Sequence, residues 1–298
     1  MVFRRLLGTW LQNTARQKLR EKMVAAAREE IAAAARASET KQAADREQPC
    51  DVGVVCALGI EAGGLHDLLQ GLVVTRGYGF VARQGTLKGR QVVVIQSGPG
   101  GQAATRATEA LLTGHHPSWV ISAGFAGGLD PKLKRHDLLM VDGLVDESGK
   151  RLALDLKVDP EALAQTPGVH VGRLLSVDRI VRSPDEKRAL GEAHEAVAVD
   201  METFAVAEVC REARVRFLAI RIVIDAVDQE LPPDLRRLMK PQTHVRKLGA
   251  VFGTVWNRPS SVKDMLGLKE NALLGSDRLA KFLASTIEQL APLPPACK

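Results

Sequence analysis

Short runs of apolar, β-branched residues alternate with helical patterns along most of the chain. The apolar runs predict strands at residues 52–58, 91–96, 119–123, 138–141, 171–175, 197–199 and 217–224. Helical patterns fall between or after them, at residues 61–69, 102–112, 184–194, 203–213, 234–256 and 260–290. Repeated strand–loop–helix units are typical of a parallel sheet with helices on both faces. We therefore predict a three-layer α/β fold with a mostly parallel, twisted central sheet.

Residues 1–48 have a different pattern and predict a helical arm and linker ahead of an α/β domain over residues 49–298. Good helix formers dominate the segment, and one apolar stripe runs along it, made of Phe3, Leu6, Leu7, Trp10 and Leu11. A basic amphipathic helix of this kind can lie on an anionic membrane, so residues 1–20 are a candidate membrane contact. Docking on the protein itself or on a partner subunit, and a targeting peptide, are the alternatives.

Charge and cysteine usage narrow the classes of function. Residues 1–48 carry a net +4 of the chain's +6, and the rest has no basic stripe interleaved with aromatic residues, which argues against nucleic-acid binding. No apolar run reaches the roughly 18–20 residues that a membrane span needs. The four cysteines lack metal-ligand spacing, so we expect no metal, no cofactor and a reducing, cytoplasmic location, at most peripheral to a membrane.

Two glycine-rich loops follow successive predicted strands. Gly98 and Gly100, with Ala103, give the G-x-G-x-x-A spacing before a helix. A dinucleotide site would also need an acid at the end of the second strand, where this chain has Gly124. Backbone N–H groups at such a helix start can instead hold a phosphate or an attacking water. Simple tight turns are the alternative for both loops.

Acids occur where predicted strands end. Asp200 and Glu202 lie between a strand and a helix, where capping of the helix is one explanation. Asp225 ends an apolar strand, where an acid needs a partner or a ligand. Ligands of α/β proteins bind beyond the carboxyl ends of the strands, so these acids, with Glu61, are candidate site residues.

Taken together, five segments resemble the purine nucleoside phosphorylase superfamily, and most closely its methylthioadenosine/S-adenosylhomocysteine nucleosidase branch. In chain order they are VGVVCALGIEAGGL, QSGPG, SAGFAGGL, AVDMETFAVAEVC and AIRIVIDAVDQ, and the resemblance covers roughly residues 51–228. The last two place Glu202 and Asp225 23 residues apart, as in the family pattern. The resemblance implies the three-layer nucleoside phosphorylase-like fold.

The resemblance also implies the chemistry of the acids. Cleaving an N-ribosidic bond builds positive charge on the sugar and negative charge on the departing base. Asp225 would protonate the purine, which requires a raised pKa. Glu202 would bind the ribose hydroxyls above Met201, and Glu61 would activate the attacking water. The expected substrate is a purine nucleoside, with adenine as its base.

Further site residues come from the same resemblance. Phe125, Ala126 and Gly127 would lie near the ribose and the nucleophile, and Ile180 would cover the base. Gly98, Gly100 and Arg106 are candidates for holding the nucleophile, including phosphate if the enzyme is a phosphorylase. Family members usually form homo-oligomers, in which a neighbour completes the pocket.

The sequence departs from the nucleosidase pattern at Asp200, where a Glu is usual, and at Phe125 and Ile224, where Ser is usual. A bulkier, more apolar pocket suggests a modified 5′ position on the nucleoside. The variants GFAGGLDP and VDME are similar to the hopanoid-associated phosphorylase-like group, thought to act on an adenosylated lipid.

Three functions follow as alternatives. Glu61 favours hydrolysis, because a hydrolase needs a base for water. Phosphorolysis, which gives ribose-1-phosphate, needs donors for phosphate, and Arg83, Arg106 and Arg221 are candidates. A non-catalytic nucleoside-binding module of the same fold is the third alternative.

Overall fold

The computed structural model describes residues 50–77, 79–231 and 259–290. The predicted arm over residues 1–48 and the helical pattern over 234–256 lie outside these ranges. In chain order the elements are β1 (Val52–Cys56), α2 (Gly59–Leu68), β2 (Gln70–Gly77), β3 (Phe80–Leu87), β4 (Arg90–Gln96), α3 (Gly101–His115), β5 (Trp119–Gly128), β6 (Leu138–Asp146), β7 (Arg151–Ala153), α4 (Pro160–Ala164), β8 (Val169–Ser176), α5 (Pro184–His194), β9 (Ala198–Asp200), α6 (Thr203–Glu212), β10 (Arg216–Asp225) and α9 (Pro259–Gln289).

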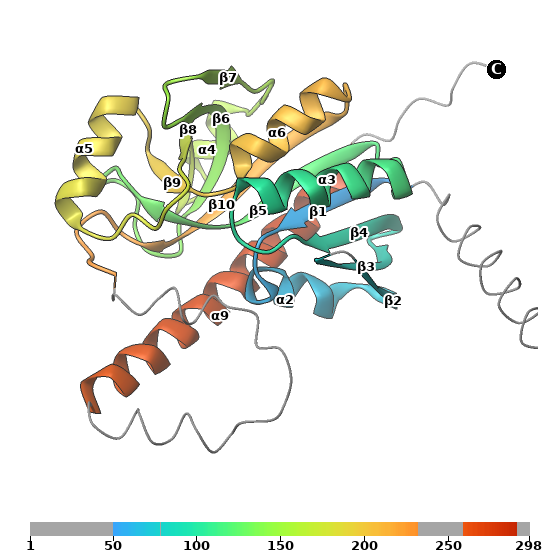
Figure 1. The fold of residues 1–298 in the computed structure, drawn as a ribbon, viewed down its shortest axis with the longest axis horizontal. Helices are drawn as coiled ribbons and strands as arrows, with labels where there is room; N and C mark the ends of the chain where they lie inside the picture. Colours follow the sequence, from blue (N-terminus) through green and yellow to red (C-terminus); the bar gives the residue numbers. More distant parts are fainter. Residues whose placement is uncertain (1–49, 78, 232–258, 291–298) are drawn as a thin grey trace, which may run out of the picture. The chain divides into compact units, whose positions relative to one another are not determined.

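The described strands form one sheet, in the order β10-β6-β8-β9-β5-β1-β4-β3-β2, with β7 beside β6 (Figure 1). One parallel group contains β4, β1, β5 and β10, and a second contains β6, β8 and β9. Antiparallel pairings of β10 with β6 and of β5 with β9 join the two groups into a closed circuit. The α/β fold is confirmed, and parallel and antiparallel pairings are more evenly balanced than the sequence indicates.

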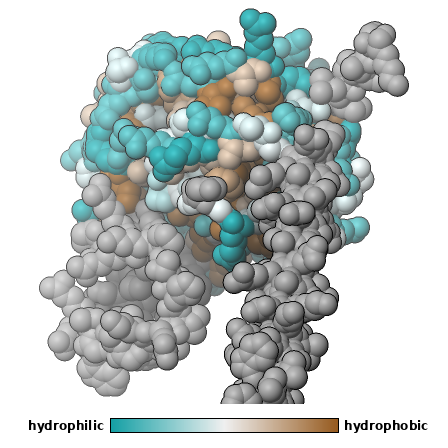
Figure 2. Space-filling view, turned by 45° about the vertical axis from the view of Figure 1, so that its right-hand side comes forward, coloured by the Kyte–Doolittle hydropathy of each residue, from teal (hydrophilic) through white to brown (hydrophobic). Residues whose placement is uncertain are grey.

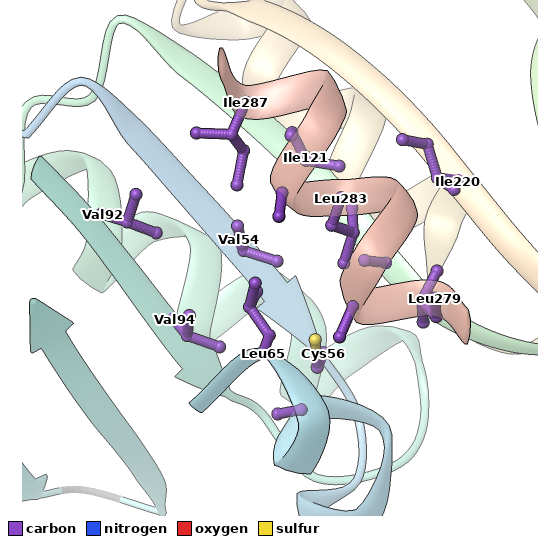
Figure 3. Packing of buried hydrophobic residues seen from close by; sticks show 14 of the residues in the cluster. Val54, Cys56, Leu65, Val92, Val94, Ile121, Ile220, Leu279, Leu283 and Ile287 are labelled. Carbon is purple, nitrogen blue, oxygen red and sulfur yellow. The ribbon is translucent and has the colours of Figure 1, made fainter. Parts of the chain in front are cut away.

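Helices cover both faces of the β4-β1-β5 region. On one face, α2 and α9 pack against each other and bury Val54, Leu65 and Leu279 (Figure 3). On the other face, α3 and α6 pack together over Val55 and its neighbours. Adjacent residues of a strand point to opposite faces, so the VGVVC run supplies both cores. Each fully buried Leu or Val contributes about 1.5–3 kcal/mol to folding, so both layers are strongly fixed.

The strands expected from apolar runs and the expected helices within residues 50–231 are present, with boundaries shifted by a few residues. The hairpin of β2 and β3 was not predicted. Its outer strand β2 is exposed along nearly its whole length, so it has no apolar alternation to reveal it. The helical pattern over 260–290 forms one helix, α9.

The parallel strands place their carboxyl ends at one edge of the sheet, where the candidate acids lie. Residues 57–61 follow β1, residues 97–100 follow β4, and Asp225 is the last residue of β10. Strand β5 runs on through the glycine-rich segment 124–128 and pairs with β10 up to Asp225. The edge is thus built from segments far apart in sequence.

The outer surface of the described part is mostly hydrophilic on the face that Figure 2 shows, with smaller apolar areas. The exposed large apolar side chains are Leu68, Leu72, Val73, Val74, Leu273 and Leu274, on α2, β2 and α9. Within the described ranges, no helix is long and apolar enough to cross a membrane.

Candidate active site

Glu61 lies in the first turn of α2, just after β1. Its Oε2 accepts a hydrogen bond from the N–H of the N-cap residue Leu58 at 2.7 Å, as an acid at this helix position commonly does. Its Oε1 accepts from the N–H of Phe125 in β5 at 2.9 Å. The carboxylate therefore stabilises the helix start and also joins that start to a neighbouring strand.

The close approach of Glu61 to β5 depends on Gly124. A Cβ at position 124 would lie 2.8 Å from Glu61 Oε1, closer than real contacts allow. Burial raises the pKa of the Glu61 carboxyl, while the N–H donors of Phe125 and Leu58 and the charge of Arg221 oppose the rise. A carboxyl with a raised pKa can take up a proton at pH values closer to neutral.

The loop after β4 connects the end of the sheet to Glu202. The N–H of Gly98 donates to the carbonyl of Ala57 at 3.0 Å, which holds the loop against the end of β1. Gly98 and Gly100 have φ of +84° and +94°, a conformation that favours glycine. The N–H of Gly100 donates to Glu202 Oε1 at 2.7 Å. The loop therefore contacts one of the candidate acids.

Asp200 and Glu202 have different contacts, which separate the helix-capping acid from the acid that is available to a ligand. Asp200 Oδ2 accepts hydrogen bonds from the N–H and the hydroxyl of Thr203, the first residue of α6, so Asp200 caps that helix start. Glu202 occupies the N-cap position but makes no side-chain cap bond, and reaches Gly100 instead. Burial, with the charges of Asp200 and Glu61, raises the pKa of Glu202 to about 8.

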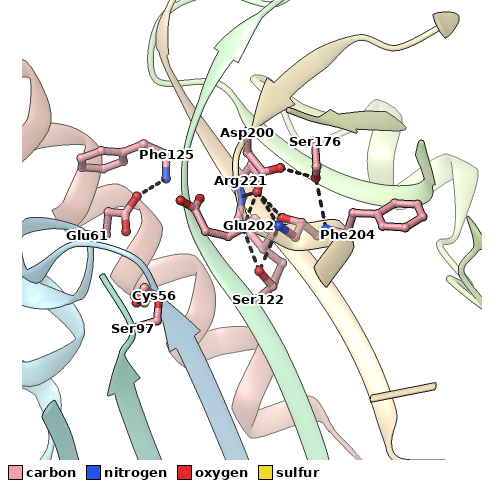
Figure 4. A network of polar contacts seen from close by, with 12 residues as sticks. Cys56, Glu61, Ser97, Ser122, Phe125, Ser176, Asp200, Glu202, Phe204 and Arg221 are labelled. Carbon is pink, nitrogen blue, oxygen red and sulfur yellow. Dashed lines mark hydrogen bonds and ion pairs between the residues drawn. The ribbon is translucent and has the colours of Figure 1, made fainter. Parts of the chain in front are cut away.

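A buried ion pair lies next to these acids (Figure 4). Arg221 Nη2 lies 2.9 Å from Asp200 Oδ2 and donates to the hydroxyls of Ser122 and Thr203. The second oxygen of Asp200 accepts from the Ser176 hydroxyl. Both charged side chains are almost fully buried, and their polar atoms are paired, as buried charges require.

Asp225 is buried at the end of β10 beside a lysine of α5. Lys187 Nζ lies 2.6 Å from Asp225 Oδ2, although the contact lacks the angles of a hydrogen bond. Burial raises the pKa of Asp225, and the charge of Lys187 opposes the rise. Gly127 leaves space beside the carboxyl, since a Cβ there would lie 3.2 Å from Oδ2.

The remaining expected site residues lie on the same edge. Phe125 is half-buried in β5 next to Glu61, and Ala126 is buried one residue further on. Met201 is half-buried, with its carbonyl close to the start of α3 at Gly101. Ile180 is half-buried in the segment between β8 and α5. The structure thus brings Glu61, Glu202 and the two glycine-rich segments together.

The three arginines considered for phosphate differ in their surroundings. Arg221 donates hydrogen bonds to Asp200, Ser122 and Thr203. Arg106 lies on the exposed side of α3 and makes no hydrogen bond or ion pair with any described residue. Arg83 lies in β3, where burial and the charge of Arg76 lower its pKa. Neither Arg83 nor Arg106 contacts the acids at the sheet edge.

Sequence reasoning missed Lys187, although a signal was present. In α5 the residues three and four positions later are Leu190 and Gly191, which face the protein interior, so this lysine shares the inward side of the helix. Ser122 and Thr203 were also missed, because a hydroxyl in an apolar or helical segment carries no spacing signal of its own. Among the described residues, no cluster of three or more His, Cys, Asp or Glu side chains could hold a metal ion.

The fold and the site define a class of protein. The family model of the phosphorylase superfamily matches residues 51–247, and the chain belongs to this superfamily.

The proteins similar to this chain include nucleosidases and a futalosine hydrolase. Over 203 residues the chain is 27% identical to 5′-methylthioadenosine/S-adenosylhomocysteine nucleosidase of Tolumonas auensis, covering 61% of this chain and 88% of the relative. The solved nucleosidase from Neisseria meningitidis in complex with methylthio-immucillin-A is similar with a TM-score of 0.62 and 22% identity, covering 82% of this chain and 100% of that one. A futalosine hydrolase mutant of Helicobacter pylori gives a TM-score of 0.60 and 21% identity, covering 81% and 100%.

Proposed function

We propose that the chain hydrolyses the N-ribosidic bond of a purine nucleoside with a modified 5′ position, with adenine as the base. The observation that carries this proposal is the set of three acids at one sheet edge, Glu61, Glu202 and Asp225, each with a raised pKa. Perturbed acids gathered in this way are typical of catalytic sites. Membership of the phosphorylase superfamily and the similarity to nucleosidases support the same reaction.

Asp225 is the proposed general acid. As the bond between C1′ and N9 breaks, negative charge develops on the purine, and a proton delivered to N7 makes the base a better leaving group. The buried position of Asp225 favours the protonated form that this role needs. Gly127, opposite Asp225 in the β5–β10 register, leaves space beside the carboxyl.

Glu202 is the proposed ligand of the ribose hydroxyls. Its carboxyl is held by the Gly100 N–H and not by its own helix, which leaves the second oxygen for the sugar. Met201 precedes it and is proposed to pack beneath the ribose, and Ile180 is proposed to cover the base. Hydrogen bonds between the Glu202 carboxyl and the ribose hydroxyls would polarise the sugar in the transition state.

Glu61 is the proposed base for the attacking water. It is buried near Glu202, as the effect of its charge on the pKa of Glu202 indicates. Phosphorolysis is less well supported, because Arg221 is already saturated by Asp200 and its hydroxyl partners, and Arg106 is exposed. A tetrahedral dianion requires several free donors, whereas water requires one base.

The 5′ substituent is proposed to meet an apolar surface. Phe125 and Ile224 stand at the two positions where the nucleosidase pattern has serine. Both approach Gly275 of α9, where a Cβ would lie 3.7 Å from the Phe125 ring and 3.8 Å from Ile224. An aliphatic or thioether substituent suits such a surface better than a charged one.

We propose two further features from the sequence alone. Residues 1–48 form a part separate from the catalytic domain over 49–298, and residues 1–20 contact an anionic membrane surface. The domain forms a homo-oligomer. Liposome flotation of the full chain and of a variant lacking residues 1–48 tests the membrane contact, since unchanged flotation would exclude it. Light scattering tests the oligomer.

Purine release from a panel of nucleosides, followed by base absorbance with and without phosphate, tests the proposed reaction. We expect 5′-substituted adenosines to release adenine at the same rate in both buffers, with free ribose as the sugar product. Phosphate-dependent release with ribose-1-phosphate would identify a phosphorylase. Binding without release would identify a nucleoside-binding module.

A further inference from the structure

Lys187 is the only lysine that is fully buried among the described residues, with 0% exposure. It lies in the first turn and a half of α5, after the N-cap Ser183 and Pro184. Burying an ammonium group away from water is costly unless its donors are paired. The polar neighbours of the ammonium group therefore have to account for its burial.

Three oxygen atoms lie close to Nζ of Lys187. Its Nζ donates to the carbonyl of Ala226 at 2.9 Å and to the carbonyl of Gln229 at 2.6 Å. The third neighbour is Asp225 Oδ2 at 2.6 Å. The two carbonyls use two of the three donors of an ammonium. They hold the nitrogen at ion-pair distance from the carboxylate of Asp225.

Other groups near Asp225 are less suited to exchange a proton with it. Arg135 contributes a positive charge, but its guanidinium donates to the Gln229 side chain at 2.8 Å and does not lose a proton in the working pH range. The paired strand β5 presents Gly127 at this point. Among the described residues, Lys187 is thus the amine that lies directly against the Asp225 carboxyl.

We propose that Lys187 is a positioning residue that orients Asp225 and supplies the proton which Asp225 delivers to the purine. This inference rests on the proposed function. It goes further by assigning the source of the proton that Asp225 passes to the purine.

The proposed proton transfers return every group to its starting state. When the bond between C1′ and N9 breaks, its electron pair stays on the purine, and Asp225 gives a proton to N7. A proton moves from Lys187 Nζ to Asp225 Oδ2, which leaves a neutral amine that still donates to the carbonyls of Ala226 and Gln229. Water adds to C1′ and loses a proton to Glu61. After the base leaves, Lys187 regains a proton and Glu61 loses one to solvent.

The test compares Lys187→Met with Lys132→Met, a matched change at an exposed lysine. Two substrates are used: 5′-methylthioadenosine, whose base needs a proton, and p-nitrophenyl riboside, whose phenolate leaves without one. We expect Lys187→Met to lower kcat for the purine nucleoside about 100-fold, in the range typical of general acid catalysis. The aryl riboside should lose less than about tenfold, because its leaving group bypasses Asp225. Lys132→Met should change neither rate.

Equal losses on both substrates would overturn the inference, because they would indicate a structural role only. An unchanged or higher rate of purine release by Lys187→Met would also overturn it, because then Lys187 merely keeps Asp225 ionised. Should Lys187→Met fail to fold, Lys187→Gln keeps a donor for the carbonyls and serves for the same comparison. A wild-type protein that releases no purine would refute the proposed function itself, which is a distinct result.

Discussion

Two buried pairs of an acid and a cation lie four residues apart along β10, and they differ in how completely they are satisfied. In the first, Arg221 pairs with Asp200, and both also bond to hydroxyls of Ser122, Ser176 and Thr203 and to backbone groups. In the second, Lys187 pairs with Asp225, and Asp225 Oδ2 has no hydrogen-bond partner among the described residues. The polar atoms of the Arg221–Asp200 pair are fully hydrogen-bonded, whereas Asp225 in the second pair can still accept a hydrogen bond from a ligand.

This difference distinguishes a structural acid from a chemical one. A fully paired buried carboxylate has no spare proton position, so it stabilises the fold and fixes its neighbours. An incompletely paired buried carboxylate carries a free-energy cost that a bound ligand can relieve. The same contrast separates Asp200, which caps α6, from Glu202 two residues later, which reaches across to Gly100.

Asp225→Asn should give the largest effect on activity. The amide has the size of the acid but cannot deliver a proton, so we expect purine release to fall about 1,000-fold. Steady-state kinetics with 5′-methylthioadenosine measure it, with Asp228→Asn at an exposed acid as the matched control. Activity within a few-fold of wild type would show that Asp225 is not the general acid.

Arg221→Met should act on stability. It leaves Asp200 buried without its cation, and breaking a buried pair in this way costs about 3–5 kcal/mol. Urea unfolding measures the change, and Arg211→Met, at an exposed arginine, is the control. A decrease in the free energy of unfolding below about 1 kcal/mol would mean that the Arg221–Asp200 pair does not stabilise this edge of the sheet.

Glu61→Gln should lower kcat about 100-fold, because the amide cannot take a proton from water. The remaining carbonyl oxygen can still accept one of the two backbone N–H bonds, so the structure should change little. Kinetics with an aryl riboside and with 5′-methylthioadenosine should show equal losses, unlike those of Lys187→Met. Faster turnover on addition of phosphate would contradict water as the nucleophile.

Glu202→Gln should produce the smallest effect, on the pH dependence of stability. Burial raises the pKa of Glu202 to about 8, so the folded protein holds this proton more tightly than the unfolded chain, where the ordinary value is 4.5. The free energy of unfolding should therefore fall as the pH rises from about 5 to 8. Glu202→Gln should make that fall shallower, and Glu208→Gln should not. An identical slope in both variants would argue against the raised pKa.

Much of the fold could be predicted because its strands carry apolar runs and its helices carry start signals. The helix Pro184–His194 has the boundaries that Ser183, Pro184 and the following acids indicate. The exposed hairpin strand β2 could not be predicted, because pairing with β3 and not burial defines it.

The candidate site was predictable to a similar degree. The five motifs indicated Glu61, Glu202 and Asp225, but sequence alone could not divide capping from ligand binding between Asp200 and Glu202. The distinction depends on the hydrogen bond from Gly100 to Glu202, and these two residues are 102 positions apart in the chain. The spacing of Lys187 to Leu190 could have placed this lysine on the inward side of its helix. Its partner Asp225 could not be predicted, because it is distant in sequence and meets Lys187 only in the folded protein.

The most direct test of the central claim is the fate of the oxygen in a single turnover. The wild-type protein is incubated with 5′-methylthioadenosine in ¹⁸O-labelled water that contains phosphate, and both products are analysed by mass spectrometry. We predict free adenine and a 5′-methylthioribose that carries one ¹⁸O atom. An unlabelled ribose phosphate, or intact nucleoside after prolonged incubation, would contradict the account.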